Sequence, residues 1–281
     1  MLNKDLASRY LKPMKPIPAT KEKSGKPLKG IQCVMFDIYG TLLISASGDI
    51  NLVQEKFQHF DKIEYLINKF KIDIEPKPLV AALCQAIDSV HRAKRAKGII
   101  FPEVEIDRIW MQVLNNRDRE FVRKFALEYE LIINPVYPMP HLDELLKVCR
   151  SKNMRMGLIS NAQFYTVDLF KWLLGAAPVD LGFHPDLIFL SYLTGYAKPS
   201  PEPFQRSADV LKNMNIHTQS VLFLGNDMLN DILPARNIGF KTALFAGDKR
   251  SLRLREDDPR CRNLSPDIVL TDLRQLIEFI S

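Results

Sequence analysis

The chain has 281 residues, a length that accommodates one large α/β domain or a core domain with a smaller insert. Hydrophobic residues make up 46% and charged residues 26%, which is ordinary for a globular protein with a buried core. The net charge of +6 equals the excess of basic over acidic side chains in residues 1–29, so the basic pI does not indicate a charged active face.

Residues 1–30 form a basic N-terminal arm. The stretch "KPMKPIPATKEKSGKPLKG" is rich in Lys and Pro and has no sustained apolar period. We interpret it as an extended, solvated segment, with wrapping around the domain left open, rather than as a nucleic-acid or membrane-binding arm. The first thirty residues contain no signal-peptide core, and no apolar run has the length to span a bilayer. We therefore expect a cytoplasmic protein with neither a membrane nor a nucleic-acid partner.

Cysteines and histidines are dispersed along the chain. No C-x-x-C pair and no His at metal-ligand spacing accompanies Cys33, Cys84, Cys149 or Cys261. The pattern is typical of reduced thiols in core positions and does not indicate a zinc site.

The first element expected after the arm is a strand over residues 31–37, "IQCVMFD", whose apolar run suits burial on both faces. From residue 49 to residue 135 the pattern changes. Residues 51–70, 78–96 and 103–130 place apolar side chains at spacings of three and four, with no strand signal between them. This pattern predicts an all-helical insert at 49–135, between core segments 31–48 and 136–281.

Strands and helices alternate after the insert. Strands are expected at 154–160, 186–191, 220–225, 241–246 and 267–270, and helices at 141–153, 162–174, 201–214, 227–238 and 273–280. Repeated βα units with apolar strands predict an α/β fold with a doubly wound parallel sheet.

Polar residues stand where several of these strands end. Asp37 closes the first strand, Ser160-Asn161 the second, and Lys198 lies in the loop after the strand that ends at Ser191. Asp227 and Asp231 follow the strand that ends at Gly225. Each residue alone has an ordinary explanation as a turn, a helix cap or a solvated lysine. Ligands of such sheets bind at the carboxyl ends of the strands, so the coincidence predicts an active site there.

Four stretches in order resemble the motifs of the haloacid dehalogenase superfamily: "FDIYGTLL", "LISNA", "GYAKPSPEPF" and "VLFLGNDMLNDILPARNIGFKTALF". The resemblance covers nearly all of residues 31–281. It implies a Rossmann-like core, and the helical insert falls where that family carries its helical cap.

The resemblance also implies roles for individual residues. Asp37 would be the nucleophile that forms a covalent intermediate. Lys198 would neutralise Asp37 and an anionic substrate. The substrate-binding residues by this resemblance are Ser160, Asn161, Lys198, Gly40 and Thr41.

The implied cofactor is Mg²⁺, held by Asp37, the backbone carbonyl of Tyr39, and acids of the fourth motif. Two registers of that motif are open. Asp227 and Asp231 are four residues apart, whereas Asn226 and Asp231 are five apart. We favour Asp231 as a ligand in either register, with Asp227 as its partner.

Tyr39 departs from the phosphatases of the superfamily, which usually have a second Asp there as general acid and base. The Tyr-Gly-Thr sequence resembles instead the 2-haloacid dehalogenases, which need no Mg²⁺. Without that acid, a phosphatase would favour leaving groups that need little protonation, such as acyl or aryl phosphates.

Three functions therefore remain open. The first is a Mg²⁺-dependent phosphohydrolase or phosphotransferase that acts on a small phosphorylated metabolite through an aspartyl-phosphate at Asp37. The second is a 2-haloacid dehalogenase with Asp37 as nucleophile. The third is a weak or silent member that binds a ligand or a protein. We prefer the first, because paired acids in the fourth motif are unfavourable beside a substrate carboxylate without a metal. The sequence indicates neither the substrate nor the oligomeric state.

Overall fold

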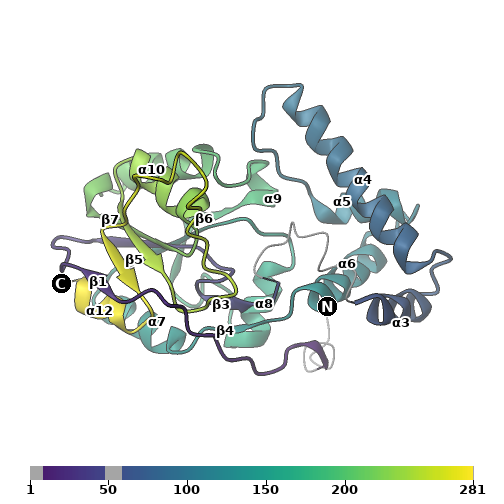
Figure 1. The fold of residues 1–281 in the computed structure, drawn as a ribbon, viewed down its shortest axis with the longest axis horizontal. Coiled ribbons are helices and arrows are strands. Elements are labelled where there is room, and N and C mark those ends of the chain that lie inside the picture. The colour runs from purple at the N-terminus through teal and green to yellow at the C-terminus, as the bar shows by residue number, and fades with distance from the viewer. Residues whose placement is uncertain (1–8, 48–58, 281) are drawn as a thin grey trace.

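A computed structural model describes residues 9–47 and 59–280. It divides into a sheet-containing core and a block of helices beside it, with the core on the left in Figure 1. The first part of the helix predicted at 51–70, and the predicted boundary at residues 48 and 49, lie outside the described residues.

The core is built on one sheet. Its strands are β1 (Ser24–Gly25), β2 (Cys33–Phe36), β5 (Arg155–Ser160), β6 (Phe183–Leu190), β7 (Val221–Gly225), β8 (Lys241–Phe245) and β9 (Ile268–Leu270). In the described residues seven strands pair in the order β1-β9-β8-β7-β2-β5-β6, and only the β1–β9 pair is antiparallel. The predicted α/β fold with a doubly wound parallel sheet is confirmed.

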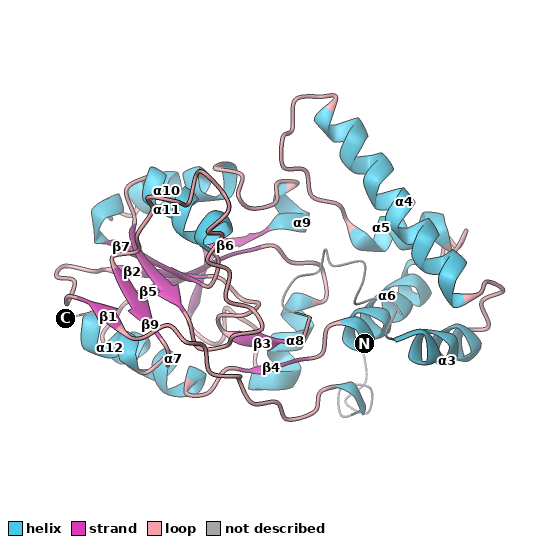
Figure 2. Ribbon diagram, in the orientation of Figure 1, coloured by secondary structure: helices cyan, strands magenta, loops and turns pink. Residues whose placement is uncertain are grey.

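Helices cover both faces of this sheet (Figure 2). One face packs against α7 (Leu142–Ser151) and α12 (Gln275–Phe279), and the other against α10 (Glu202–Asn213) and α11 (Leu233–Asn237). Val34 and Phe36 of β2 point to the first face, whereas Cys33 and Met35 point to the second. Because both sets are buried, β2 appears in the sequence as an unbroken apolar run.

The remaining core elements are short. They are α8 (Thr166–Leu174), α9 (Ser191–Thr194), the 3₁₀-helix η2 (Thr218–Ser220) and the π-helix η3 (Met228–Ile232). One helix was predicted over 227–238, but the structure divides it into η3 and α11. Pro234 lacks the N–H that a continuous α-helix needs at that position, which accounts for the change of helical pitch.

The helical block consists of α3 (Phe60–Phe70), α4 (Pro76–Arg95), α5 (Ile106–Val113) and α6 (Arg119–Ile133). It has its own apolar centre, which includes Leu66, Leu83, Trp110 and Phe125. Two short strands, β3 (Leu43–Ser45) and β4 (Val136–Pro138), pair antiparallel where the chain leaves and re-enters the core. The insert therefore stands on a two-stranded neck.

The N-terminal arm wraps the domain, which is the possibility that the sequence left open, and residues 9–30 are exposed or half-buried, so they remain in contact with solvent. β1 pairs with β9, and the Leu28 N–H donates to the Phe279 carbonyl at 2.7 Å. Met14 packs against the core, and the Tyr10 hydroxyl donates to Glu128 on α6 at 2.8 Å. Composition alone does not decide this, because backbone pairing and a few isolated apolar residues hold the arm. In Figure 1 it runs beneath the molecule from the helical block to the far edge of the sheet.

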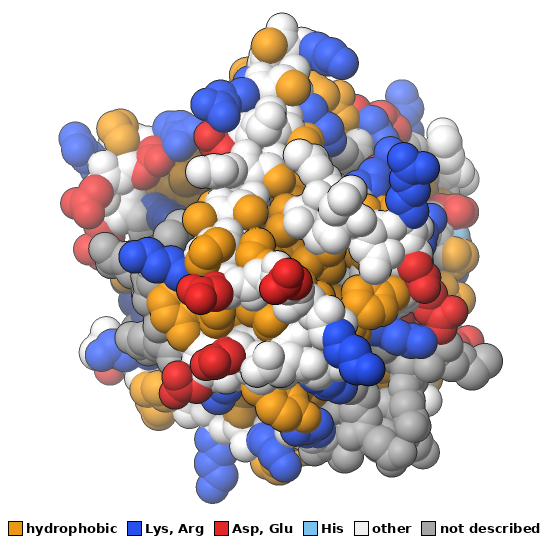
Figure 3. Space-filling view, turned by 90° about the vertical axis from the view of Figure 1, so that its right-hand side faces the viewer, with side chains coloured by type: hydrophobic (Ala, Val, Ile, Leu, Met, Phe, Trp, Pro, Cys, Tyr) orange, Lys and Arg blue, Asp and Glu red, His pale blue; other side chains and the backbone are white. Residues whose placement is uncertain are grey.

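Cys33, Cys149 and Cys261 are buried free thiols and Cys84 is half-buried, as expected. Over 9–47 and 59–280, no helix has both the length and the apolar character needed to cross a bilayer. On the face of the helical block shown in Figure 3, basic side chains are scattered among acidic and apolar ones rather than gathered into one patch.

Candidate active site

Asp37, at the carboxyl end of β2, is met by two other predicted residues, Ser160 from the end of β5 and Lys198 from the loop after β6 and α9. Asp37 is only 5% exposed, and its N–H donates to the Leu224 carbonyl of β7 at 2.9 Å. Ser160, the last residue of β5, donates its hydroxyl to Asp37 Oδ1 at 2.9 Å. Lys198 Nζ donates to the same oxygen at 2.6 Å. Asp37 Oδ2 has a single longer contact, with Thr41 Oγ1 at 3.4 Å, so it is the oxygen left to react.

Lys198 also bonds Asp231 Oδ1 at 2.5 Å, so its ammonium group lies between two buried carboxylates. Burial alone lowers the pKa of Lys198, but the negative charges of Asp231 and Asp37 outweigh it and the pKa is raised. Burial and the charges of Asp37 and Asp227 raise the pKa of Asp231 to about 7, against the opposing effect of Lys198. Above the pKa of Asp231, where both acids are ionised, two carboxylates and one lysine leave a surplus negative charge in this buried site.

The strand end of β7 fixes Asp231. Its Oδ2 accepts the backbone N–H groups of Asn226 and Asp227, both at 3.0 Å. A Cβ on Gly225 would lie 2.5 Å from that oxygen, so only glycine leaves room for the carboxylate. The sequence Gly225-Asn226 therefore positions Asp231 beneath Lys198.

The Asp227 carboxylate is engaged outside the cluster of Asp37, Lys198 and Asp231, so its predicted pairing with Asp231 at a metal stays a prediction. The Asp227 carboxylate caps η3 by accepting the Leu229 and Asn230 N–H groups at 2.8 and 3.1 Å. Arg255 forms an ion pair with it, with Nη2 2.6 Å from Oδ2. This arginine stands 28 residues further along the chain, so local spacing could not reveal the contact.

Gly40 and Thr41 shape the turn after β2 and were predicted to bind substrate. The Gly40 N–H donates to the Leu43 carbonyl at 2.6 Å, and Thr41 is fully buried. Thr41 Oγ1 lies 3.0 Å from Asn226 Oδ1, to which it donates. Gly40 has φ +86°, and a Cβ there would collide with Ser251. Both residues thus support the turn, and their polar groups are already used.

Asn161 holds the Lys198 loop in place. Its Oδ1 accepts the Lys198 N–H at 2.7 Å, and its Nδ2 donates to the Lys198 carbonyl at 3.3 Å. Both halves of the amide are therefore committed to positioning the lysine.

The Tyr39 side chain is not placed to transfer a proton at Asp37. Its hydroxyl shares a 2.8 Å hydrogen bond with Thr166 on α8. Burial raises the pKa of Tyr39 above its usual range, although the Thr166 bond opposes the effect. This side chain therefore does not replace the missing carboxylic acid.

A cavity of about 490 Å³ lies between the helical block and the core. Its walls include Lys198 and Asn161 from the core and Leu83, Ile87 and Trp110 from the insert. Sequence reasoning missed the polar residues of the insert that also line it: His91, Arg95, Glu103, Tyr129, Glu130 and Asn134. The Tyr129 hydroxyl and His91 Nε2 are buried and find no hydrogen-bond partner among the described residues, so they are available to a ligand.

Oxygen atoms around Asp37 suit Mg²⁺. In the described part of the chain, no three His, Cys, Asp or Glu side chains converge on a metal position. Mg²⁺ in proteins is commonly held by one or two carboxylates together with waters and substrate phosphate. Asp37 and Asp231 would supply the carboxylates and Asn226 Oδ1 a neutral oxygen, while the Tyr39 carbonyl stays a predicted ligand. The surplus negative charge fits a cation, and the register with Asn226 agrees with the geometry.

Comparison with known proteins gives a consistent picture. A profile of haloacid dehalogenase-like hydrolases matches residues 31–239. The pyrophosphatase PpaX of Oceanobacillus iheyensis is 24% identical over 254 residues, which cover 89% of this chain and 97% of that protein. A glyceraldehyde 3-phosphate phosphatase of Methanocaldococcus jannaschii is 22% identical over 200 residues, 70% of this chain and 79% of that protein.

Two solved structures share the fold. A 2-haloacid dehalogenase from Pseudomonas syringae has a TM-score of 0.58 at 19% identity, covering 89% of this chain and 97% of its own. A phosphatase from Thermococcus onnurineus has a TM-score of 0.52 at 16% identity, covering 88% and 97%. The same architecture thus carries both chemistries, so the reaction must be argued from the site.

Proposed function

Because this chain belongs to the haloacid dehalogenase-like hydrolases, we propose that it is a Mg²⁺-dependent phosphohydrolase or phosphotransferase for a small phosphorylated metabolite. The observation that carries the proposal is the placement of Lys198 between Asp37 and Asp231 at the wall of the cavity between the core and the insert. Phosphoryl transfer depends mainly on positioning and charge neutralisation, which this arrangement supplies. The phosphatase names of the two relatives support the same class of substrate.

Asp37 Oδ2 attacks phosphorus, the bond between phosphorus and the leaving oxygen breaks, and an aspartyl-phosphate forms. Ser160 and Lys198 hold Oδ1, so the carboxylate is fixed in orientation and Oδ2 is the oxygen that attacks. When bound by Asp37, Asp231, Asn226 and the Tyr39 carbonyl, Mg²⁺ adds charge neutralisation for the phosphoryl oxygens. Water then attacks the phosphorus, phosphate leaves and the Asp37 carboxylate is restored; an acceptor alcohol in place of water gives phosphotransfer.

A 2-haloacid dehalogenase is the second candidate. Tyr39 supports this candidate. The ion pair between Arg255 and Asp227 supports it too, because it engages one of the two carboxylates of the fourth motif. The surplus charge of Asp37 and Asp231 opposes it, since the substrate of such an enzyme carries its own carboxylate.

A substrate screen separates the candidates. We expect phosphorylated metabolites to be hydrolysed with Mg²⁺ and not with chelator, and 2-chloropropionate to be inert. Asp37→Asn should lower the rate on every substrate by roughly 10⁴-fold or more, because it removes the attacking carboxylate. A melting temperature equal to that of the wild type would show that the loss is chemical.

Equal hydrolysis of 2-chloropropionate with and without chelator, and none of any phosphate ester, would establish the dehalogenase instead. No turnover of either class would indicate a silent, ligand-binding member.

A further inference from the structure

An alkyl phosphate releases an alkoxide that needs a proton, and the residues nearest Asp37 do not supply one. The Tyr39 hydroxyl is bonded to Thr166. Lys198 holds its protons against Asp37 and Asp231. A donor must therefore come from elsewhere in the cavity, and carboxylic acids are common donors.

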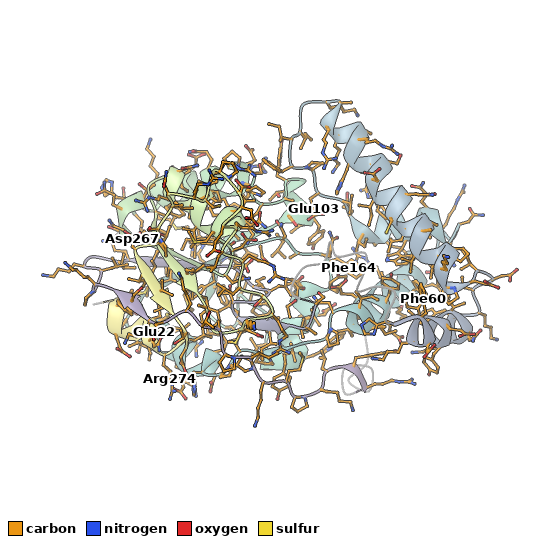
Figure 4. All side chains as sticks on the ribbon, in the orientation of Figure 1. Glu22, Phe60, Glu103, Phe164, Asp267 and Arg274 are labelled. Atoms are coloured by element: carbon orange, nitrogen blue, oxygen red, sulfur yellow. The ribbon has the colours of Figure 1, made fainter. Side chains whose placement is uncertain are left out.

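Glu103 is a carboxylate of the insert that is fastened beside the Lys198 loop. Its N–H donates to the Gly195 carbonyl at 3.0 Å, and the Ala197 N–H donates to the Phe101 carbonyl at 2.9 Å. Residues 101–103 thus lie antiparallel to residues 195–197, which lead directly into Lys198. Glu103 and Lys198 line the same cavity, and Figure 4 labels Glu103 at the junction of the core and the insert.

The surroundings of Glu103 accept both of its protonation states. Ser191 Oγ accepts the Ala162 N–H at 2.9 Å and lies 2.6 Å from Glu103 Oε2 and 3.2 Å from the Ala162 carbonyl. When Glu103 is ionised, the serine proton points to Oε2, which explains the short distance. When Glu103 is protonated, its Oε2 donates to Ser191 Oγ and the serine proton rotates to the Ala162 carbonyl, while Oε1 accepts the Val104 N–H at 2.8 Å in both states.

Burial raises the pKa of Glu103, although its bonds from Ser191 and Val104 and the charge of Lys94 oppose the effect. A raised pKa keeps a larger fraction of the acid protonated near neutral pH. The other carboxylate that lines the cavity in the described residues, Glu130, bonds Tyr165 and is the matched control for Glu103.

We infer that Glu103 is the general acid and base of this site, taking the role that the residue at position 39 has lost. The inference rests on the proposed phosphatase function. As Asp37 bonds to phosphorus and the ester bond breaks, Glu103 gives its proton to the leaving oxygen. Its carboxylate then takes a proton from the water that attacks the aspartyl-phosphate, and phosphate and free Asp37 are released. With Glu103 in place, alkyl phosphates become substrates, and the preference for aryl or acyl phosphates expected from Tyr39 disappears.

The test compares two esters of similar size, p-nitrophenyl phosphate and 2-phenylethyl phosphate, with the full-length protein and Mg²⁺. The nitrophenolate leaves without a proton, whereas the alkoxide needs one. We expect the wild type to hydrolyse both. Glu103→Gln should lose about 10²- to 10⁴-fold on the alkyl ester. With p-nitrophenyl phosphate it should keep the wild-type burst of one nitrophenol per enzyme and then turn over slowly, because the base of the second step is also lost.

Several results would overturn the inference about Glu103 and leave the proposed phosphatase function standing. One is a wild-type enzyme that hydrolyses the aryl ester but not the alkyl ester. A second is a Glu103→Gln variant whose burst slows as much as its alkyl rate, which is the signature of a purely structural role. A third is the same selective loss in Glu130→Gln and not in Glu103→Gln. A wild type inactive on both esters would instead overturn the proposed function, and the inference with it.

If Glu103→Gln lowers the melting temperature, Glu103→Asp tests the same point, because it retains a carboxyl group. Its ratio of alkyl to aryl rates should exceed that of Glu103→Gln. Equal ratios would count against the inference.

Discussion

At the scale of single residues, the site depends on Lys198 and on Gly225, which leaves space for the Asp231 carboxylate that Lys198 contacts. Lys198 bridges Asp37 and Asp231, and Asp231 is held by two backbone N–H groups at the end of β7. Gly225 leaves the space that this carboxylate occupies. The position of one acid therefore depends on a residue that carries no chemistry itself.

Substituting Gly225 by Ala should therefore damage both stability and activity. The added methyl group would lie 2.5 Å from Asp231 Oδ2. We expect a cost of about 1–3 kcal/mol in the free energy of unfolding. We also expect a loss of about 10²-fold in kcat, since the carboxylate moves away from Lys198. Gly175→Ala is the control: it introduces backbone strain at φ +79° but meets no atom within 4 Å. Unchanged kcat in Gly225→Ala, measured with the substrate found in the screen, would contradict this account.

The raised pKa of Asp231, caused by its burial beside other carboxylates, predicts that the stability of the protein depends on pH. Its pKa rises from the ordinary value of 3.8 to about 7 in the folded protein, so within that window the folded state binds more protons than the unfolded state. The contribution of Asp231 to stability is thus present at low pH and is lost as pH rises through the window. Denaturant unfolding in chelator should show this fall for the wild type and a flatter profile for Asp231→Asn. Parallel profiles of the two proteins would refute the assignment.

At the scale of elements, the N-terminal arm is a strap rather than a tail. Besides pairing with β9, it receives the Lys249 N–H at the Ile17 carbonyl, at 2.7 Å, and the Ile17 N–H donates to Asp248 at 3.1 Å. Its Tyr10 end reaches Glu128 on α6, a residue that also accepts Lys69 of α3 at 2.6 Å. The arm thus touches the sheet edge and the insert in one continuous segment.

Deleting residues 1–29 should therefore destabilise the protein. Loss of the partly buried Tyr10, Met14 and Leu28 side chains amounts to about 3 kcal/mol. For a protein of this size we expect the melting temperature to fall by roughly 6–12 °C. Deleting residues 1–8 alone leaves every one of these contacts and serves as the control. Equal melting temperatures for the wild type and the longer deletion would contradict this and favour a solvated arm that does not stabilise the fold.

At the scale of the whole molecule, several connections in the described residues hold the insert over the carboxyl edge of the sheet. They include the β3–β4 neck, the pairing of residues 101–103 with 195–197, the hydrogen bonds of Gln163 to Val104 and Ile106, and the arm through Tyr10. The second connection brings Glu103, from the middle of the insert, to the loop that carries Lys198. A site enclosed in this way excludes bulk water and favours small substrates that diffuse in.

The sequence by itself determined the core sheet and the set of residues gathered at its edge. Apolar runs such as "VMF" and the alternation of strands and helices are local patterns, and parallel topology then brings Asp37, Ser160 and Lys198 to one edge whatever the details of packing. Only the tertiary structure decided which side chains are free to act. Asp227 is neutralised by an arginine 28 residues away, Glu103 meets a serine 88 residues away, and Tyr10 meets a glutamate 118 residues away. Contacts between such distant segments depend on how the helices and strands pack against one another. Local periodicity in the sequence does not encode that packing.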